Sequence, residues 1–68
     1  MPNKKLLYYV IPKESFEVEG RIFIKDEKYP VYDNDGFSIV CAENGEFNFA
    51  NHLMSEVINK WDLEVSEV

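Results

Sequence analysis

The chain has 68 residues, with 13 acidic and 7 basic side chains, a formal net charge of −6, and apolar residues at 46%. This length suits a single domain, residues 1–68, and the apolar content argues against a disordered chain. One cysteine excludes an internal disulfide, and one histidine beside it leaves too few ligands for a structural zinc site. We expect no membrane segment, because the longest apolar run, residues 6–11, is far shorter than the roughly 20 residues that a spanning helix requires.

The first part of the chain predicts two strands after a short polar start. Residues 1–5 are polar and basic, and we expect them to be frayed. Residues 6–11 are rich in strand formers and end at Pro12; because both faces are apolar, this strand is either covered on both sides or part of a dimer contact. Residues 16–19 alternate as a half-buried strand does, and Gly20 follows at a bulge or tight bend.

The next strand, residues 21–25, has two different faces. Ile22 and Ile24 share one of them, and Phe23 lies on the other between two basic residues. We expect the two isoleucines to face the core and Phe23 to face the solvent, unless a bulge at Gly20 reverses the strand.

In the centre of the chain, two predicted strands are separated by residues that favour a turn. Residues 31–32 predict a short strand that ends at a turn, Asp33–Gly36. The strand that follows, residues 37–41, has Phe37, Ile39 and Cys41 on one face, where Cys41 would serve as a small core residue.

A hairpin and a helix complete the pattern. Asn44–Gly45 is a favoured two-residue hairpin turn, and residues 46–49 form its returning strand, so that the stretch 6–49 is β-rich. Asn51 is expected to cap a helix over residues 51–61. The apolar stripe of this helix comprises Leu53, Met54, Val57, Ile58 and Trp61.

The sequence therefore predicts a mainly β fold with one C-terminal α-helix. Five short strands with regularly spaced turns are typical of a small barrel or a strongly curled antiparallel meander sheet. The last residues, 62–68, alternate in polarity and fit either an edge strand or an ordered tail.

The turn at Asp33–Gly36 does not belong to an EF-hand calcium site. With Gly36 in the sixth position of the loop, the first position is Val31 and the twelfth is Ala42, where a bidentate glutamate is required. We therefore expect no metal site and interpret the segment as a solvated turn.

Catalytic constellations are missing from the pattern as well. His52 is the only histidine, and Cys41, Ser38 and Ser55 are the nucleophiles that it would have to activate. The paired carboxylates fall in turns or on outward faces, whereas acid–base catalysis requires a carboxyl group in an apolar pocket. We expect neither an enzyme nor a cofactor.

Charge is distributed unevenly along the chain. Residues 1–28 contain six basic and five acidic side chains, whereas residues 29–68 contain one basic and eight acidic side chains, a net charge of −7. This asymmetry argues against direct nucleic-acid binding, which requires a basic patch. It favours a protein partner with a basic surface, and in a sharper version the carboxylates imitate a phosphate backbone.

The aromatic content indicates a contact surface. Tyrosine is a common interface anchor because its ring is large and its hydroxyl tolerates water. The expected contact aromatics are Tyr8, Tyr9, Tyr29 and Tyr32, and the expected acidic rim comprises Asp33, Asp35, Glu43 and Glu46.

Three segments together resemble a family. The stretch Phe16–Phe23, the turn and aromatic of Asp33–Phe37, and the hairpin Asn44–Phe47 are similar to small SH3-like barrel proteins encoded by bacteriophages and prophages. The resemblance covers about half the chain and implies a five-stranded SH3-like barrel in a bacterial cytoplasm. It transfers no catalytic residue; it implies that the protein binds a host protein and redirects or blocks it.

The sequence thus predicts a non-enzymatic, acidic protein-binding module. One alternative is a DNA mimic that inhibits a nucleic-acid-binding protein. Another is a structural or accessory protein that works by self-association. A homodimer is also an alternative, because both faces of the predicted strand at residues 6–11 are apolar.

Overall fold

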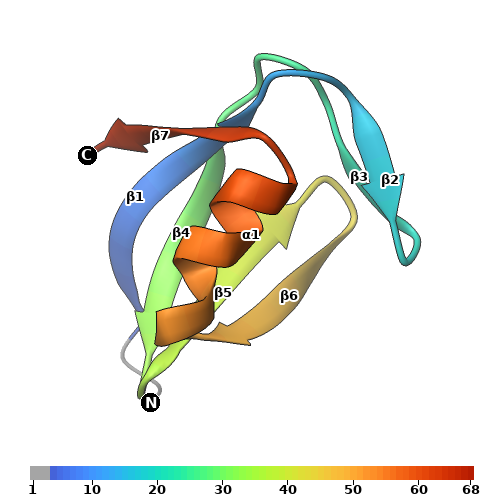
Figure 1. The fold of residues 1–68 in the computed structure, drawn as a ribbon. Coiled ribbons are helices and arrows are strands. Elements are labelled where there is room, and N and C mark those ends of the chain that lie inside the picture. The colour runs from blue at the N-terminus through green and yellow to red at the C-terminus, as the bar shows by residue number, and fades with distance from the viewer. Residues whose placement is uncertain (1–3) are drawn as a thin grey trace.

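The computed structural model describes residues 4–68 and places most of them in antiparallel β-strands (Figure 1). The prediction of a mainly β fold with one C-terminal helix is confirmed, but with seven strands in this range instead of five. The elements are β1 (Lys5–Pro12), β2 (Phe16–Val18), β3 (Arg21–Phe23), β4 (Tyr29–Asn34), β5 (Phe37–Ala42), β6 (Gly45–Ala50), the 3-10 helix η1 (Asn51–Leu53), the α-helix α1 (Met54–Lys60) and β7 (Leu63–Glu67).

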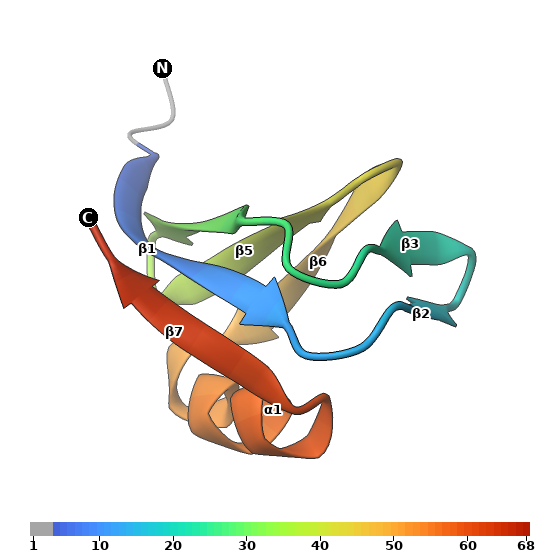
Figure 2. The same ribbon diagram turned by 90° about the horizontal axis from the view of Figure 1, so that it is seen from above.

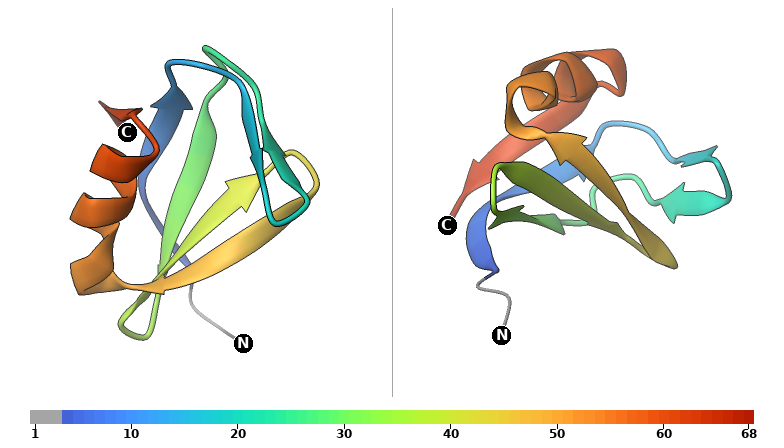
Figure 3. Two further views of the ribbon diagram at one scale, coloured as in Figure 1. Left: turned by 45° about the vertical axis from the view of Figure 1, so that its right-hand side comes forward. Right: turned by 90° about the horizontal axis from the view of Figure 1, so that it is seen from below.

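Five of the strands form one sheet in the order β6-β5-β4-β1-β7, and β2 pairs with β3 in a separate two-stranded sheet. The segment left open as a tail or a strand is therefore β7, which returns to the far side of β1. Because β6 and β7 are the edges of the larger sheet, residues 4–68 form an open, twisted sheet and no closed barrel. Figures 2 and 3 show α1 against one face of this sheet and the β2–β3 hairpin extending to one side.

Two tight hairpins fix which residues face each other. Glu19–Gly20 joins β2 to β3, and Asp35–Gly36 joins β4 to β5; all four residues have φ between +49° and +88°. Positive φ at both central positions is the signature of the type I′ turn, whose twist matches that of the strands it joins. The third hairpin differs from the prediction: Ala42 pairs with Gly45, so Glu43 and Asn44 form the turn between β5 and β6.

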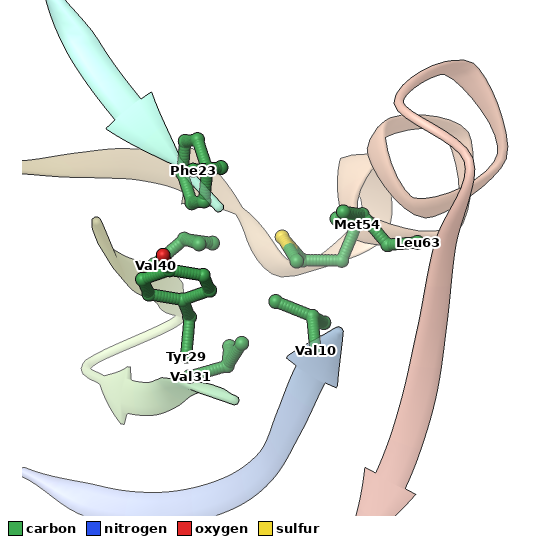
Figure 4. Close-up of a cluster of buried hydrophobic side chains, with 7 residues drawn as sticks. All are labelled: Val10, Phe23, Tyr29, Val31, Val40, Met54 and Leu63. Carbon is green, nitrogen blue, oxygen red and sulfur yellow. The ribbon is translucent and has the colours of Figure 1, made fainter. Parts of the chain in front are cut away.

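The core lies between the sheet, α1 and the β2–β3 hairpin. Figure 4 shows its buried side chains, which are Val10, Phe23, Tyr29, Val31, Val40, Met54 and Leu63. Around them the rings of Phe16, Phe23, Phe47, Phe49 and Trp61 form a continuous aromatic cluster, with centroid separations of 5.0 to 6.4 Å. A ring removes more apolar surface from water than any other side chain, so this cluster dominates the burial.

The predicted orientation of β3 is wrong. Phe23 is fully buried, whereas Ile22 and Ile24 are 41% and 42% exposed. The two-residue turn leaves β2 and β3 without a bulge and pairs Phe16 directly with Phe23. The two rings then stack at 5.0 Å on one face, and burying this pair excludes the isoleucines from the core.

Asn51 begins the helical segment but does not cap it with its side chain. Ala50 occupies the cap position, and the Asn51 side chain accepts a hydrogen bond from Ser38 Oγ at 2.6 Å and donates one to Asp33 Oδ1 at 3.2 Å. Asn51 thus attaches the start of η1 to the ends of β4 and β5. The predicted helix over residues 51–61 is divided into η1 and α1, and Trp61 follows as the C-terminal cap.

Candidate protein-contact surface

A β-bulge in β1 sends the tyrosines to different faces of the sheet. Leu6 pairs with Tyr32, but Tyr8 pairs with Val31, so one extra residue, Leu7, interrupts the alternation. Tyr8 therefore lies on the same face as the buried Val31, and it packs against the core. Beyond the bulge the alternation resumes, and Tyr9 lies on the opposite face with Tyr32. The run at residues 6–11 thus supplies Tyr8 and Val10 to the helix-covered face and Leu6 and Tyr9 to the opposite face.

We define the outer face as the face of the five-stranded sheet opposite α1. The strand pairings, read with the two-residue alternation, place a largely apolar set of side chains there. Its central members are Leu6, Tyr9, Pro30, Tyr32, Phe37, Ile39 and Cys41. No helix covers this set within residues 4–68 (Figure 2).

Tyr32 and Ile39 form the middle of the outer face. Tyr32 on β4 stands directly opposite Leu6 on β1 and Ile39 on β5. Ile39 is only 3% exposed. Phe37, two residues before Ile39 on the same strand face, is 52% exposed. An apolar surface of this kind is a usual feature of contact sites.

A shallow pocket lies at one end of the outer face. It has a volume of about 220 Å³ and is lined by Asn34, Phe37 and Asn48. Pockets for small-molecule ligands usually measure roughly 300–1,000 Å³, so this one suits a single side chain of a partner better than a substrate. Its two amides supply hydrogen-bond donors and acceptors beside an exposed ring.

Tyr29 is not available for contact, which corrects its placement among the contact aromatics. Its ring is 4% exposed and packs edge-on against Phe23 at 5.1 Å. Its hydroxyl donates to Glu43 Oε2 at 2.7 Å and accepts from the Ile24 backbone N–H at 2.8 Å. Burial and the hydrogen bond to Glu43 raise the pKa of Tyr29. Tyr29 therefore joins β4, the end of β3 and the β5–β6 turn.

The four predicted acidic rim residues do not lie together. Glu46 is exposed on β6 opposite Cys41, on the outer face, and Asp35 is exposed at the β4–β5 turn. Asp33 lies on the other face, where it accepts the hydrogen bond from Asn51, and Glu43 is engaged by Tyr29. Half of the set thus serves internal hydrogen bonds, and the other half stays free to meet a partner.

A cation takes part in the outer face as well. The ammonium of Lys28 lies 5.7 Å from the ring centroid of Tyr9, a cation–π arrangement at the start of β4. Tyr9 itself stands opposite Pro30. This corner of the outer face is therefore aromatic and positively charged, whereas Glu46 at the opposite side supplies negative charge.

Cys41 does not have the surroundings of a reactive thiol. Burial and the neighbouring carboxylate of Glu46 raise its pKa, and Lys4 offsets only part of this effect. Because the thiolate is the nucleophile, a raised pKa disfavours covalent chemistry at neutral pH. His52 is exposed in η1, and residues 4–68 contain no group of three acidic, histidine or cysteine side chains placed to hold a metal ion.

Three residues of the outer face were missed by the sequence analysis: Phe37 as an exposed ring, and Asn34 and Asn48 beside it. A signal for Phe37 exists in the sequence. The hairpin that follows β5 pairs Val40 with Phe47 and Ser38 with Phe49, so burying the two phenylalanines turns Phe37 outward. The expectation that Cys41 faces the core fails for the same reason.

The comparisons with known proteins add no relative. No family model, no curated protein and no solved structure matches this chain. Within the part of the chain that the structure describes, the helices are too short and too polar to cross a membrane.

Proposed function

We propose that this protein is a non-enzymatic binding module whose outer face docks on a protein with a basic surface. The observation that carries the proposal is the group of Tyr9, Tyr32 and half-exposed Phe37 on a sheet face without a helix, next to a pocket of side-chain size. A few aromatic anchors of this kind supply most of the affinity of an interface.

Charge selects the class of partner. The net charge is −6, and of the expected acidic rim Glu46 is exposed on the outer face and Asp35 is exposed at the β4–β5 turn. A basic partner surface is attracted over long range, which accelerates association and orients the encounter. We accordingly expect association to slow as salt rises, while dissociation, governed by the aromatic contacts, changes little.

The cellular setting belongs to the same proposal. It rests on the resemblance of Phe16–Phe23, Asp33–Phe37 and Asn44–Phe47 to small SH3-like proteins of bacteriophages, although the five-stranded sheet is open and does not form their closed barrel. We propose that the protein acts in a bacterial cytoplasm on a host protein, which it modulates or inhibits. The DNA-mimic alternative has less support, because Asp33 and Glu43 are occupied by hydrogen bonds and leave a broken pattern of free carboxylates.

The test compares two matched double variants as baits in a bacterial lysate. Tyr32→Ser with Phe37→Ser removes two rings from the outer face, whereas Ile24→Ser with Leu53→Ser removes exposed apolar side chains elsewhere. We expect a captured protein to be lost with the first variant and retained with the second. The purified pair should then show at least a tenfold difference in affinity between the two variants.

Three outcomes contradict the proposal. If the outer-face variant retains the captured protein, the outer face is not the surface that binds it. Displacement of that protein by duplex DNA favours the DNA-mimic alternative. Concentration-dependent sedimentation of the protein alone, abolished by the outer-face variant, assigns the surface to self-association.

A further inference from the structure

The free edge of β7 is a second surface able to bind a partner. β7 pairs with β1 from Tyr8 opposite Glu67 to Pro12 opposite Leu63, and it is the last strand of the five-stranded sheet. In Figures 1 and 2 it runs along the outside of the molecule, and no strand within residues 4–68 lies beyond it. Half of the backbone N–H and C=O groups of such an edge strand point away from the sheet and can pair with another strand.

The side chains of β7 give this edge a distinct chemistry. Glu64 and Glu67 are exposed, and the two-residue alternation places them on opposite faces of the strand. Between them Val65 is 45% exposed. Residues 62–68 contain three acidic side chains and no basic one, and of the three only Asp62 has an ion-pair partner among the described residues, Lys13 at 3.3 Å.

This charge pattern disfavours a second copy of the same strand. Antiparallel pairing of β7 with β7 from another molecule would place Glu64 and Glu67 of both copies in one short ladder. Like charges directly opposite each other across a ladder are destabilising. A positively charged strand would be attracted by the same carboxylates, so this edge favours basic partner strands over acidic ones.

The other edge of the sheet lacks this combination. β6 carries a single acidic residue, Glu46. At its first residue, Gly45, the Arg21 side chain packs close to the backbone, and the guanidinium of Arg21 lies 5.0 Å from the Phe47 ring centroid. A basic strand is therefore better accommodated at β7 than at β6.

We propose that β7 binds an extended, basic segment of a partner protein by antiparallel strand addition. Opposite Glu67, Ser66, Val65 and Glu64 in turn, such a segment reads basic, any residue, apolar, basic. Backbone hydrogen bonds provide the affinity of this mode of recognition, and the alternating side chains provide its specificity. The inference goes beyond the proposed function and does not require the outer face to bind anything.

The experiment uses the full chain, isotopically labelled, and an eight-residue peptide with the central sequence Lys-Thr-Val-Lys between serine and threonine residues. We expect the peptide to protect alternate backbone amides of β7 from hydrogen exchange, because only the outward-facing half gains partners. A peptide of identical composition with the two lysines adjacent should bind at least fivefold more weakly.

Charge reversal sharpens the test. Glu64→Lys with Glu67→Lys should weaken binding of the lysine peptide at least tenfold and create binding of a peptide with glutamates in place of the lysines. The matched control, Glu17→Lys with Glu19→Lys, changes two exposed acids of the β2–β3 hairpin, which belongs to the separate two-stranded sheet, and should leave the affinity within about twofold.

The proposal is overturned by any of several results. These are no binding, equal binding of the two lysine peptides, binding without alternate amide protection, and perturbation centred on β6. The outer-face variant Tyr32→Ser with Phe37→Ser must retain the peptide. If that variant loses a partner from the lysate but still binds the peptide, the result supports the outer-face proposal and leaves the β7 proposal unaffected.

Discussion

The two faces of the five-stranded sheet use similar residues for different purposes. On the helix-covered face, the rings of Phe47 and Phe49 stack at 5.7 Å and meet Trp61 at 5.4 and 5.7 Å. On the outer face, Tyr9 and Tyr32 meet a lysine, a proline and aliphatic side chains. Aromatic content alone does not separate a core from a contact surface; the difference lies in what packs over the strand.

The largest expected effect separates a core ring from an outer-face ring. Phe23→Ala should cost about 3–5 kcal/mol of unfolding free energy, because Phe23 is fully buried and contacts Phe16, Tyr29 and Trp61. A domain of this size rarely has more than about 3–5 kcal/mol in total, so the variant should be unfolded at 25 °C. Phe37→Ala, at a 52% exposed position, should lose less than about 1 kcal/mol.

Chemical denaturation followed by the fluorescence of Trp61 measures both variants. Similar losses for Phe23→Ala and Phe37→Ala would show that the outer face is as much a core as the other side.

The second prediction compares two tyrosines that are three residues apart on β4. Tyr29→Phe removes the hydroxyl and leaves the Ile24 N–H without its partner, which should cost about 1–3 kcal/mol. Tyr32→Phe on the outer face should change stability by less than about 0.5 kcal/mol. Equal losses, measured by urea denaturation, would contradict the assignment of the two rings to different roles.

Alkaline pH provides an independent check on Tyr29. Its pKa is raised in the folded protein, so above the ordinary value of 10.0 the unfolded chain releases the proton first. Stability from this group is therefore complete below pH 10 and is lost as the pH rises further towards the folded-state pKa. Thermal melts across this range should show a smaller decline for Tyr29→Phe than for the parent protein.

The third prediction concerns the turn that keeps each residue of β4 and β5 on its face. Gly36 has φ of +88°, and a side chain there is strained although no atom lies close enough to collide with it. Gly36→Ala should cost about 1–2 kcal/mol, the penalty of a left-handed conformation for a residue with a Cβ atom. Asp35→Asn should be neutral, since asparagine suits the same turn. Thermal melts that rank these variants in reverse would exclude the type I′ turn.

The smallest expected effect uses Cys41 as a reporter of the outer face. Glu46 contributes to the raised pKa of this thiol, so Glu46→Gln should increase its rate of reaction with a disulfide reagent at pH 8 by a factor of about two. Glu43→Gln, which alters a carboxylate bound to Tyr29, is the control and should leave the rate unchanged. A thiol buried under the helix-covered face would react only on unfolding, with no dependence on Glu46.

The sequence analysis succeeded where a pattern is local. Asp35–Gly36 marks a turn by its residue types, and the alternation of Phe47 with Phe49 requires only a short segment. The predicted apolar stripe of the helix is confirmed for Met54, Val57, Ile58 and Trp61, whereas Leu53 is exposed. Prediction failed where two faces of one strand were both apolar. In β3 the core receives Phe23 and not Ile22 or Ile24, and in β5 Val40 packs in the core cluster and Ile39 does not. Which face is buried depends on the rings packed across from the strand, and those rings come from distant parts of the chain.

The contact surface was only partly predictable for the same reason. Tyr9 and Tyr32 were identified from the aromatic content and lie on the outer face. The sequence does not indicate that the Tyr29 hydroxyl bonds to the Ile24 backbone and the Glu43 side chain. The four acidic rim residues were predicted to lie together because they are close to one another in the sequence. Their side chains diverge because successive residues of a strand point to opposite faces and because turns separate them.

The extra residue in β1 has a consequence for the evolution of the chain. At Leu7 the strand changes phase, so that Lys5 and Leu6 follow one alternation and Tyr8 to Pro12 follow the other. Deletion of Leu7 would place Leu6 directly before Tyr8, so the alternation would become uniform and every remaining side chain of β1 would keep its present face. The composition of β1 is thus more constrained than its length at this point, and a homologue that lacks one residue here would lose the local bend of the bulge without exchanging the two faces of the strand.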